Sequence, residues 1–397
     1  MNVDADLSAL REYLAAAGLD GYLIDDDASD SDQRYVSGFT APDLYQTLVT
    51  REGIHLLVSG LEYGRASAEA NADTVTRRAA YDYQQLVAEH GQYEGRIQTI
   101  AAFLADHDVA SIAVPRSFPT GTADGLREHG LTVTVESDGI VTDIRASKTD
   151  WELEQIRASQ RANEAAMARA EELIATATIE DGTLVHDGDP LTSERVTEDI
   201  EITLLRHGCA LDDTIVACGA DGADPHDRGS GPLEADELIV IDIFPRDKET
   251  GYHADMTRTF ARGDPGAEAS RRYEVTREAY EAALETVEAG VTGAAVHGAA
   301  CDVIEDAGYA TLRSDPTTET GFIHSTGHGV GLDIHEQPSV SSAGGELQPG
   351  HVISIEPGIY DPAVGGVRIE DLIVVTEDGY ENLTDYRVGL DPVADSR

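Results

Sequence analysis

Lysine is almost missing from this chain. Lys148 and Lys248 are the only lysines among 28 basic residues, and 75 acidic residues leave a formal net charge of −47. Such a surface repels nucleic acids and anionic membranes, so we expect neither as a partner. An acidic excess with few lysines is typical of proteins from a high-salt cytoplasm, where counterions screen the repulsion between surface acids. The composition predicts a halophilic, haloarchaeal protein.

Cysteine and long apolar runs are scarce as well. Cys209, Cys218 and Cys301 are odd in number and show no close-paired spacing, which argues against a disulfide framework and a zinc ribbon. We expect them to be core thiols. No apolar run approaches the length of a membrane span, and the N-terminal stretch is acidic where a signal peptide would be basic. The cytoplasm is the predicted compartment.

The length of 397 residues favours two domains, and the 41% of hydrophobic residues, which recur periodically, excludes a disordered acidic chain. Helix and strand patterns alternate up to about residue 145 and predict an α/β domain without a cluster of catalytic residue types. A boundary follows, because Thr149 and Glu152 have the spacing of a capping box that starts a long amphipathic helix. The predicted domains are 1–146 and 147–397.

The second domain is predicted to be α+β. Besides the helix after Thr149, helical patterns cover residues 191–208 and 268–290, and each ends at a glycine. Five strand patterns are expected at residues 213–219, 237–244, 253–260, 351–360 and 366–375.

Carboxylates occupy unusual places in these strands. Asp242 shares a strand face with Leu238 and Val240, and a buried, isolated carboxylate is so costly that it needs a cation, a proton or a metal. The next strand supplies Asp255. If the two aspartates face each other across a hairpin, its tip falls between Lys248 and Glu249, in a turn-like stretch.

The two C-terminal strands repeat this arrangement. Glu356 and Glu370 flank a loop centred on Ala363, and Glu370 shares its strand face with Arg368. Arg368 is either an ion-pair partner of Glu370 or a residue that orients it. Any one of these acids is more readily explained by a salt bridge than by a metal, whereas four on two hairpins are difficult to explain by chance.

A histidine-rich stretch, GFIHSTGHGVGLDIHEQPS at residues 321–339, completes the donor set. Four carboxylates and one glycine-flanked histidine give five oxygen or nitrogen donors without cysteine. Such a set suits Mn²⁺, Co²⁺, Fe²⁺ or Zn²⁺, and its charge balances two divalent ions. Two such ions generate a nucleophile from water at neutral pH and stabilise a developing oxyanion.

The ordered motifs YVSGF, DPH, IDIF, GYHADMTRTF, HSTGHGVGLDIHE, SIEPGIY and GVRIED span nearly the whole chain. In these motifs and their order, the sequence resembles the pita-bread metallopeptidases. Among them it resembles the X-Pro peptidases (prolidase and aminopeptidase P), which have a creatinase-like N-terminal domain. The resemblance implies an α/β N-terminal domain and a pita-bread catalytic domain. It implies that Asp242 binds one ion, that His328 and Glu356 bind the other, and that Asp255 and Glu370 bridge both. His226, His324 and His335 correspond to histidines that contact the substrate.

The resemblance implies hydrolysis of Xaa-Pro bonds in short proline-containing peptides by a homodimer, with Glu356 as the proton shuttle. Three kinds of alternative use the same fold. A metal-free relative, either a creatinase-type C–N hydrolase or a binding-only protein, would have lost ligands. A methionine aminopeptidase would lack the large N-terminal domain. A metal-dependent lyase keeps the ligands and stays open as an alternative function.

Outside the motifs, we expect His351 to face solvent.

Overall fold

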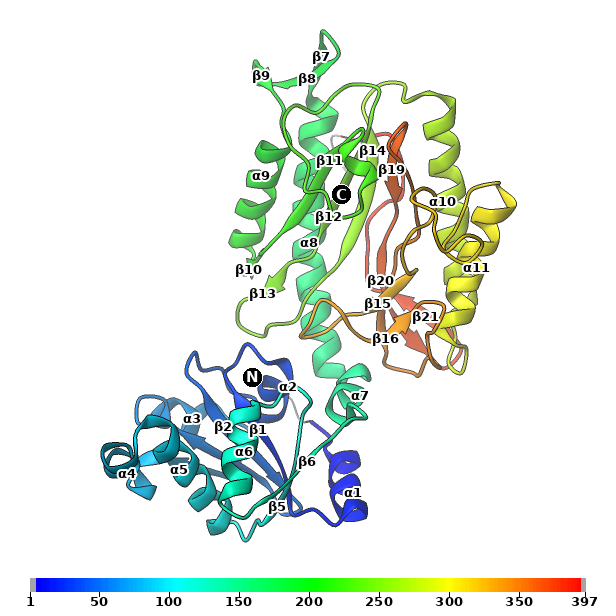
Figure 1. Cartoon of the computed structure of the whole chain (residues 1–397). Coiled ribbons are helices and arrows are strands. Elements are labelled where there is room, and N and C mark those ends of the chain that lie inside the picture. Colours follow the sequence, from blue (N-terminus) through cyan, green and yellow to red (C-terminus); the bar gives the residue numbers. More distant parts are fainter. Residues whose placement is uncertain (1–4, 394–397) are drawn as a thin grey trace. The chain divides into compact units, whose positions relative to one another are not determined.

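A computed structural model of the chain describes residues 5–393 (Figure 1). The chain divides into two compact units, residues 1–145 and 146–397. None of the helices among the described residues is long and apolar enough to cross a membrane. Cys209 and Cys301 are buried, as predicted for core thiols, whereas Cys218 is only half-buried.

The first unit is an α/β domain built on one mixed sheet. Its strand order is β4-β3-β2-β1-β5-β6, in which β1 pairs antiparallel with β2 and parallel with β5. Leu23, Leu48 and Ile112 contribute to a core between the sheet and α5, whose Ile97 and Phe103 are fully buried. The elements are α1 (Ser8–Ala17), β1 (Gly21–Asp26), α2 (Ser31–Ser37), β2 (Tyr45–Thr50), β3 (Ile54–Val58), α3 (Tyr63–Glu69), β4 (Thr74–Arg77), α4 (Tyr83–His90), α5 (Gln92–Asp106), β5 (Ser111–Val114), α6 (Thr120–Glu128), β6 (Thr132–Val135) and α7 (Ile140–Ala146).

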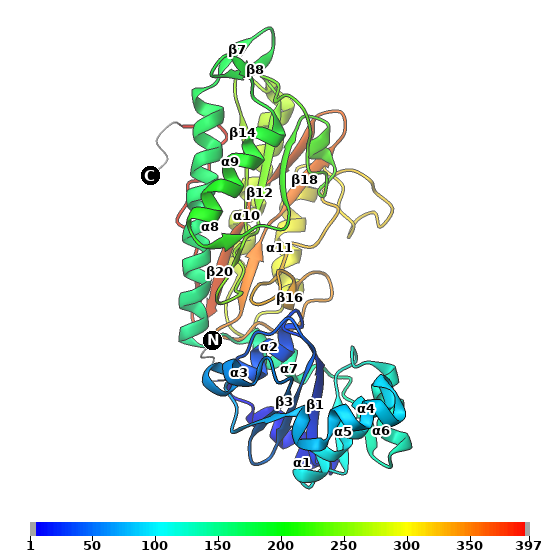
Figure 2. The same cartoon turned by 90° about the vertical axis from the view of Figure 1, so that its left-hand side faces the viewer.

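The second unit begins with a long helix, α8 (Asp150–Thr176). Its predicted capping box is present, because Thr149 accepts a hydrogen bond from the Glu152 N–H and the Glu152 side chain accepts one from the Thr149 N–H. Figure 2 shows α8 running along much of this unit. With α9 (Ser193–Arg206) it covers the sheet β11-β12-β14, and the two helices share a core with that sheet. The strands are β11 (Thr214–Cys218), β12 (Leu238–Ile243) and β14 (Met256–Ala261).

The other half of the unit has the same layers. Helices α10 (Gly266–Thr286) and α11 (Gly293–Asp306) pack on the five-stranded sheet β16-β15-β17-β20-β21. Figure 1 shows α8 and α9 on one side of this unit, α10 and α11 on the other, and the sheets between them. The strands of this sheet are β15 (Gly327–Gly329), β16 (Glu336–Val340), β17 (Val352–Ile355), β20 (Asp371–Thr376) and β21 (Gly379–Asn382). β18 (Gly358–Asp361) and β19 (Gly365–Arg368) form a separate two-stranded sheet.

The first predicted hairpin forms, but the register predicted for it was wrong. Asp242 pairs with Thr257 instead of Asp255, and the bridge between Arg246 and His253 places the tip between Glu249 and Thr250. The Asp247 side chain fixes this turn by accepting the N–H groups of the two residues at the tip. Because the register of the two strands differs from the predicted one by two residues, each side chain stays on its predicted face of the sheet. Asp255 therefore stays on the face of Asp242.

The second predicted hairpin has the expected centre, but each of its long strands is interrupted. β17 pairs with β20 and β18 with β19 in one continuous register, which places Glu356 opposite Glu370 at the break. Pro357 follows Glu356 and has no N–H to donate to a ladder. At the break, the Glu356 N–H donates instead to the Thr326 carbonyl at 2.8 Å and the Glu370 N–H to the Thr257 carbonyl at 3.1 Å.

Candidate metal centre

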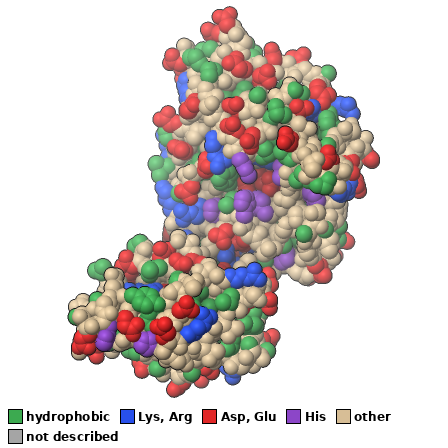
Figure 3. Space-filling model, in the orientation of Figure 1, with side chains coloured by type: hydrophobic (Ala, Val, Ile, Leu, Met, Phe, Trp, Pro, Cys, Tyr) green, Lys and Arg blue, Asp and Glu red, His purple; other side chains and the backbone are tan. Residues whose placement is uncertain are grey.

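The nine residues singled out in the sequence all line one cavity of the second unit, with a volume of about 530 Å³. Figure 3 shows histidine side chains gathered around a hollow with acidic side chains inside it. Asp242, His328 and Arg368 lie within strands, and the other six lie in loops or next to strand ends of both halves of the unit. The nine residues are His226, Asp242, Asp255, His324, His328, His335, Glu356, Arg368 and Glu370.

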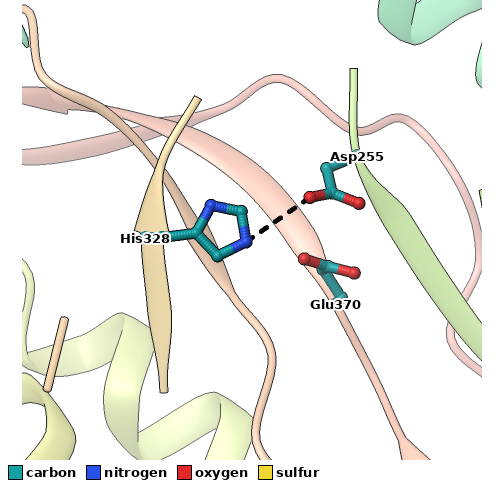
Figure 4. Close-up of side chains that lie close together, drawn as sticks. All are labelled: Asp255, His328 and Glu370. Atoms are coloured by element: carbon teal, nitrogen blue, oxygen red, sulfur yellow. Dashed lines mark ion pairs between the residues drawn. The ribbon is translucent and has the colours of Figure 1, made fainter. Parts of the chain in front are cut away.

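Three of the predicted ligands converge most closely. Donor atoms of Asp255, His328 and Glu370 all lie within 4.8 Å of one another (Figure 4). The His328 Nε2 lies 3.2 Å from Glu356 Oε1 and 3.7 Å from Asp255 Oδ2. The Nδ1–H of His328 donates to the Gly329 carbonyl at 3.1 Å, which fixes the tautomer and leaves Nε2 as the donor atom for a metal.

Glycine on either side of His328 is required by close packing of the backbone. A Cβ atom at Gly327 would lie 1.9 Å from the Ser354 carbonyl oxygen, and one at Gly329 would lie 2.1 Å from that of Gln337. Only glycine permits these approaches. The short strand β15 can therefore lie between β16 and β17, and it presents His328 to the carboxylates.

The four buried carboxylates repel one another strongly. Burial, followed by the charges of Glu370 and Asp242, raises the pKa of Asp255 well above its usual range. Burial and the charge of Glu356 do the same to the pKa of Glu370. Burial raises the pKa of Asp242 as well, although Arg368 opposes the shift. So many carboxylates cannot all stay ionised in one buried site without cations.

Glu356 is the exception among these acids. Burial would raise its pKa, but the hydrogen bond and charge of His328 outweigh burial and lower the pKa to about 2. Ser354 connects the two residues, since its hydroxyl donates to Glu356 Oε1 and accepts from the His328 N–H, both at 3.1 Å. Glu356 is thus held as an ionised acceptor.

The donor set fits divalent cations. Oδ1 of Asp242 is buried and has no hydrogen-bond partner, which is costly for a carboxylate oxygen unless a cation binds it. All donors near it are carboxylate oxygens or an imidazole nitrogen, which suit hard or borderline divalent ions. The charge of the four acids requires more than one such ion for neutrality.

Arg368 has a different partner from the predicted one. Its Nη2 donates to Asp242 Oδ2 at 2.6 Å, whereas Glu370 is reached only through Thr257. The Thr257 hydroxyl accepts from Arg368 Nε at 3.1 Å and donates to Glu370 Oε2 at 2.7 Å. Sequence analysis missed Thr257, and the available signal was its position two residues after Asp255, on the same strand face.

Both ring nitrogens of His324 are engaged. Nδ1–H donates to the Ser325 carbonyl at 2.7 Å, so Nε2 accepts from the Tyr360 hydroxyl at 2.9 Å. Burial lowers the pKa of His324 to about 4, which keeps the ring neutral at pH 7. Tyr360 also accepts from Arg368 Nη1 at 2.9 Å. This tyrosine, which sequence analysis missed, connects the histidine to the Arg368–Asp242 pair.

The other two histidines lie on the same cavity. The ring of His335 meets that of His328 edge to face, with centroids 4.2 Å apart. Burial, followed by the charge of His328, lowers the pKa of His335. His226 is exposed, and its backbone N–H is held by the Asp224 side chain at 3.0 Å.

The expectation that His351 faces solvent was wrong. Its exposed fraction is 7%, because residues 147 and 351 form a β-bridge that covers it. Its Nδ1 accepts from the Gln348 N–H at 3.1 Å. His351 lies outside the metal cavity, and its neighbour is the charged Lys148.

Comparison with known proteins agrees with this architecture. Residues 154–377 match Metallopeptidase family M24, and residues 7–147 match the Creatinase/Prolidase N-terminal domain. The chain is 30% identical over 379 residues to an Xaa-Pro dipeptidase of Pyrococcus horikoshii, covering 94% of this chain and 95% of that protein.

Solved structures with similar folds include two X-Pro peptidases. The Xaa-Pro dipeptidase from Bacillus anthracis has a TM-score of 0.81 and 25% identity, and the match covers 98% of this chain and 99% of that one. The X-Pro aminopeptidase from Thermotoga maritima has a TM-score of 0.77 and 26% identity, covering 95% and 98%. The pita-bread fold class and the family resemblance are confirmed. This chain belongs to metallopeptidase family M24 and carries a creatinase/prolidase-type N-terminal domain.

Proposed function

We propose that this metallopeptidase hydrolyses Xaa-Pro peptide bonds in short peptides, with two divalent ions bound by Asp242, Asp255, His328, Glu356 and Glu370. The observation that carries the proposal is the convergence of these five residues and three further histidines on one cavity. A volume of about 530 Å³ suits a dipeptide or the end of a short peptide, and it is too small for a folded protein. The names of the relatives from Pyrococcus horikoshii and Bacillus anthracis support the same substrate class.

The assignment of the metal donors follows the family resemblance. Asp242 would hold one ion, His328 and Glu356 would hold the other, and Asp255 and Glu370 would contribute to both. When bound, the ions supply a nucleophile from water at neutral pH and stabilise the negative charge that develops on the carbonyl oxygen. Mn²⁺, Co²⁺, Fe²⁺ and Zn²⁺ are the candidates.

The protein's own groups manage the proton and the substrate. The Glu356 carboxylate lines the cavity and would accept the proton of the attacking water. The leaving nitrogen of an Xaa-Pro bond must gain this proton, and Glu356 is the proposed shuttle. His226, His324 and His335 line the same cavity, and we assign them to contact with the substrate.

We assign catalysis to residues 147–397 alone and a non-catalytic role to residues 1–146. All nine cavity residues lie between positions 226 and 370, which supports this division. The homodimer and the cytoplasmic location stay predictions. A metal-dependent lyase on the same fold is the second candidate, since it would use the same ligands.

The test combines metal analysis with product analysis. Under metal-replete conditions, the purified protein should contain about two divalent ions per chain, and His328→Ala or Asp255→Ala should abolish turnover. Reconstitution with each candidate metal then identifies the active form. A hydrolase releases proline from Ala-Pro, whereas a lyase would leave Ala-Pro intact and release an unsaturated acid only from an acid with a leaving group at its β-carbon. Absence of a stoichiometric ion, or an unsaturated product, would refute the proposal.

A further inference from the structure

One of the two lysines of the chain is buried in the catalytic unit. The Nζ of Lys148 forms an ion pair with Oε1 of Glu336, and their side chains are only 1% and 3% exposed. Lys148 also donates to the Ala146 carbonyl at 3.3 Å. The whole residue is 8% exposed, whereas the other lysine, Lys248, is exposed.

Glu336 is the first residue of β16 and directly follows His335, the last residue of the preceding loop. A Cβ atom at Gly331 would lie 2.3 Å from Glu336 Oε1, so the carboxylate lies directly against the start of this loop. Within the sheet, Glu336 pairs with Gly329, the residue after the proposed ligand His328. The carboxylate therefore fixes residues 331–336 as a closed turn, with His335 next to its anchoring residue.

Lys148 is itself fixed to the neighbouring strand. Its backbone N–H donates to the Gly350 carbonyl at 2.9 Å, and Ser147 forms a β-bridge with His351. Residues 350 and 351 lead directly into β17, which ends at Ile355, the residue before Glu356. The ion pair thus connects the His335 loop to the strand that supplies a proposed metal ligand, and it does so from outside the cavity.

We propose that Lys148 is a positioning residue, which acts through Glu336 to hold the His335 imidazole in place for substrate binding. The inference rests on the proposed function, in which His335 contacts the substrate. The edge-to-face contact of the His335 and His328 rings, with centroids 4.2 Å apart, is the geometry that the ion pair maintains. Lys148 and Glu336 do not line the cavity, so their removal affects the substrate only through the loop.

The chain offers a matched control, because its other lysine, Lys248, is exposed at the tip of the first hairpin. Lys148→Met should raise KM for Ala-Pro about fivefold, the range expected for the loss of one hydrogen bond, while kcat and metal content change less than twofold. Lys248→Met should change none of these quantities. His335→Ala should raise KM by a similar factor.

The double variant decides whether Lys148 acts through His335. In a His335→Ala background, Lys148→Met should raise KM no further, because the group that it positions is already missing. The His335 ring resonances, assigned by comparison with His335→Ala, should shift in the NMR spectrum of Lys148→Met and stay in place in Lys248→Met. This readout does not depend on activity.

Three results would overturn the proposal: independent effects of Lys148→Met and His335→Ala on KM, loss of metal in Lys148→Met, or unchanged His335 resonances. If the unpaired Glu336 prevents folding, Lys148→Met combined with Glu336→Gln removes both charges and replaces the single variant in the cycle. If this double variant does not fold either, the ion pair serves stability alone and the proposal is refuted. Failure of the wild type to cleave Ala-Pro would refute the proposed function instead, and the NMR comparison would still test the positioning.

Discussion

Arg368 donates from Nη2 to Oδ2 of Asp242 at 2.6 Å, and both side chains are buried beside the cavity. The contact occupies one oxygen of Asp242 and leaves Oδ1 without a protein partner. Arg368 also reaches Thr257 and Tyr360, which hold Glu370 and His324. One guanidinium therefore orients two proposed ligands and one proposed substrate histidine.

Removal of this guanidinium should impair the centre as a whole. Arg368→Met leaves Asp242 unoriented, and loss of a group that orients metal ligands typically costs 10- to 100-fold in metal affinity or activity. We expect kcat/KM for Ala-Pro to fall by about that factor. Metal titration and steady-state kinetics measure the effect, with Arg277→Met as control, because Arg277 forms ion pairs only on the exposed face of α10. Wild-type kinetics in Arg368→Met would contradict this role.

His324→Ala should separate substrate handling from metal binding. His324 contacts Tyr360 and Ser325 but none of the five proposed ligands by hydrogen bond. We expect kcat/KM for Ala-Pro to fall about tenfold, the effect of one lost polar contact in the transition state, while the metal content stays at the wild-type level. Elemental analysis alongside the kinetics provides the check. Loss of metal in this variant would move His324 from the substrate to the metal centre.

The buried His351 should make the folded state sensitive to acid. Burial, and then the charge of Lys148, lowers the pKa of His351 to about 4 from an ordinary 6.5. The unfolded chain then binds a proton between pH 6.5 and pH 4 that the folded chain does not bind. Stability from this group is complete above pH 6.5 and is lost as the pH falls towards 4, by up to about 3 kcal/mol.

Urea unfolding at pH 7 and pH 5 measures this loss. The variant His351→Asn supplies an oxygen for the Gln348 N–H without a titratable ring. It should lose less stability between the two pH values than the wild type. An equal loss in both proteins would exclude His351 as the source.

Salt should stabilise the protein. A formal net charge of −47 with only 28 basic residues creates repulsion between surface acids that counterions screen. We expect Tm and activity to rise as KCl or NaCl increases into the molar range. Differential scanning calorimetry across this range of salt concentrations measures the change in Tm. A Tm at low salt as high as at molar salt would argue against the halophilic interpretation.

The sequence predicted those parts of the structure that local chemistry determines. The Thr149–Glu152 capping box and the strands around Asp242 were found because their signals lie within a few residues. Helix α11 was missed, since its alanines and glycines blur the apolar periodicity that marks a helix. The breaks after β17 and β19 were missed too, although Pro357 was a visible signal for one of them.

Other features depend on contacts between distant segments. The burial of His351 comes from its bridge to Ser147, and the partner of Arg368 follows from which strands meet at the cavity. The hairpin tip moved by one residue, and the partner of Asp242 by two, because Asp247 accepts two backbone N–H groups, a choice that strand patterns do not encode. Tyr360 was missed for the same reason, because its role depends on Arg368 and His324 meeting in space.

Specificity for proline tests the central proposal most directly. A bond to proline lacks the amide N–H that other peptide bonds offer, so the cavity must recognise the ring and the carbonyl instead. The measurement is kcat/KM for Ala-Pro against Ala-Ala, and for Met-Pro against Met-Ala, in metal-reconstituted enzyme at molar salt. We predict a preference for the proline peptides of at least about tenfold, or roughly 1.4 kcal/mol in transition-state binding. Equal values for the proline and alanine peptides would contradict the account.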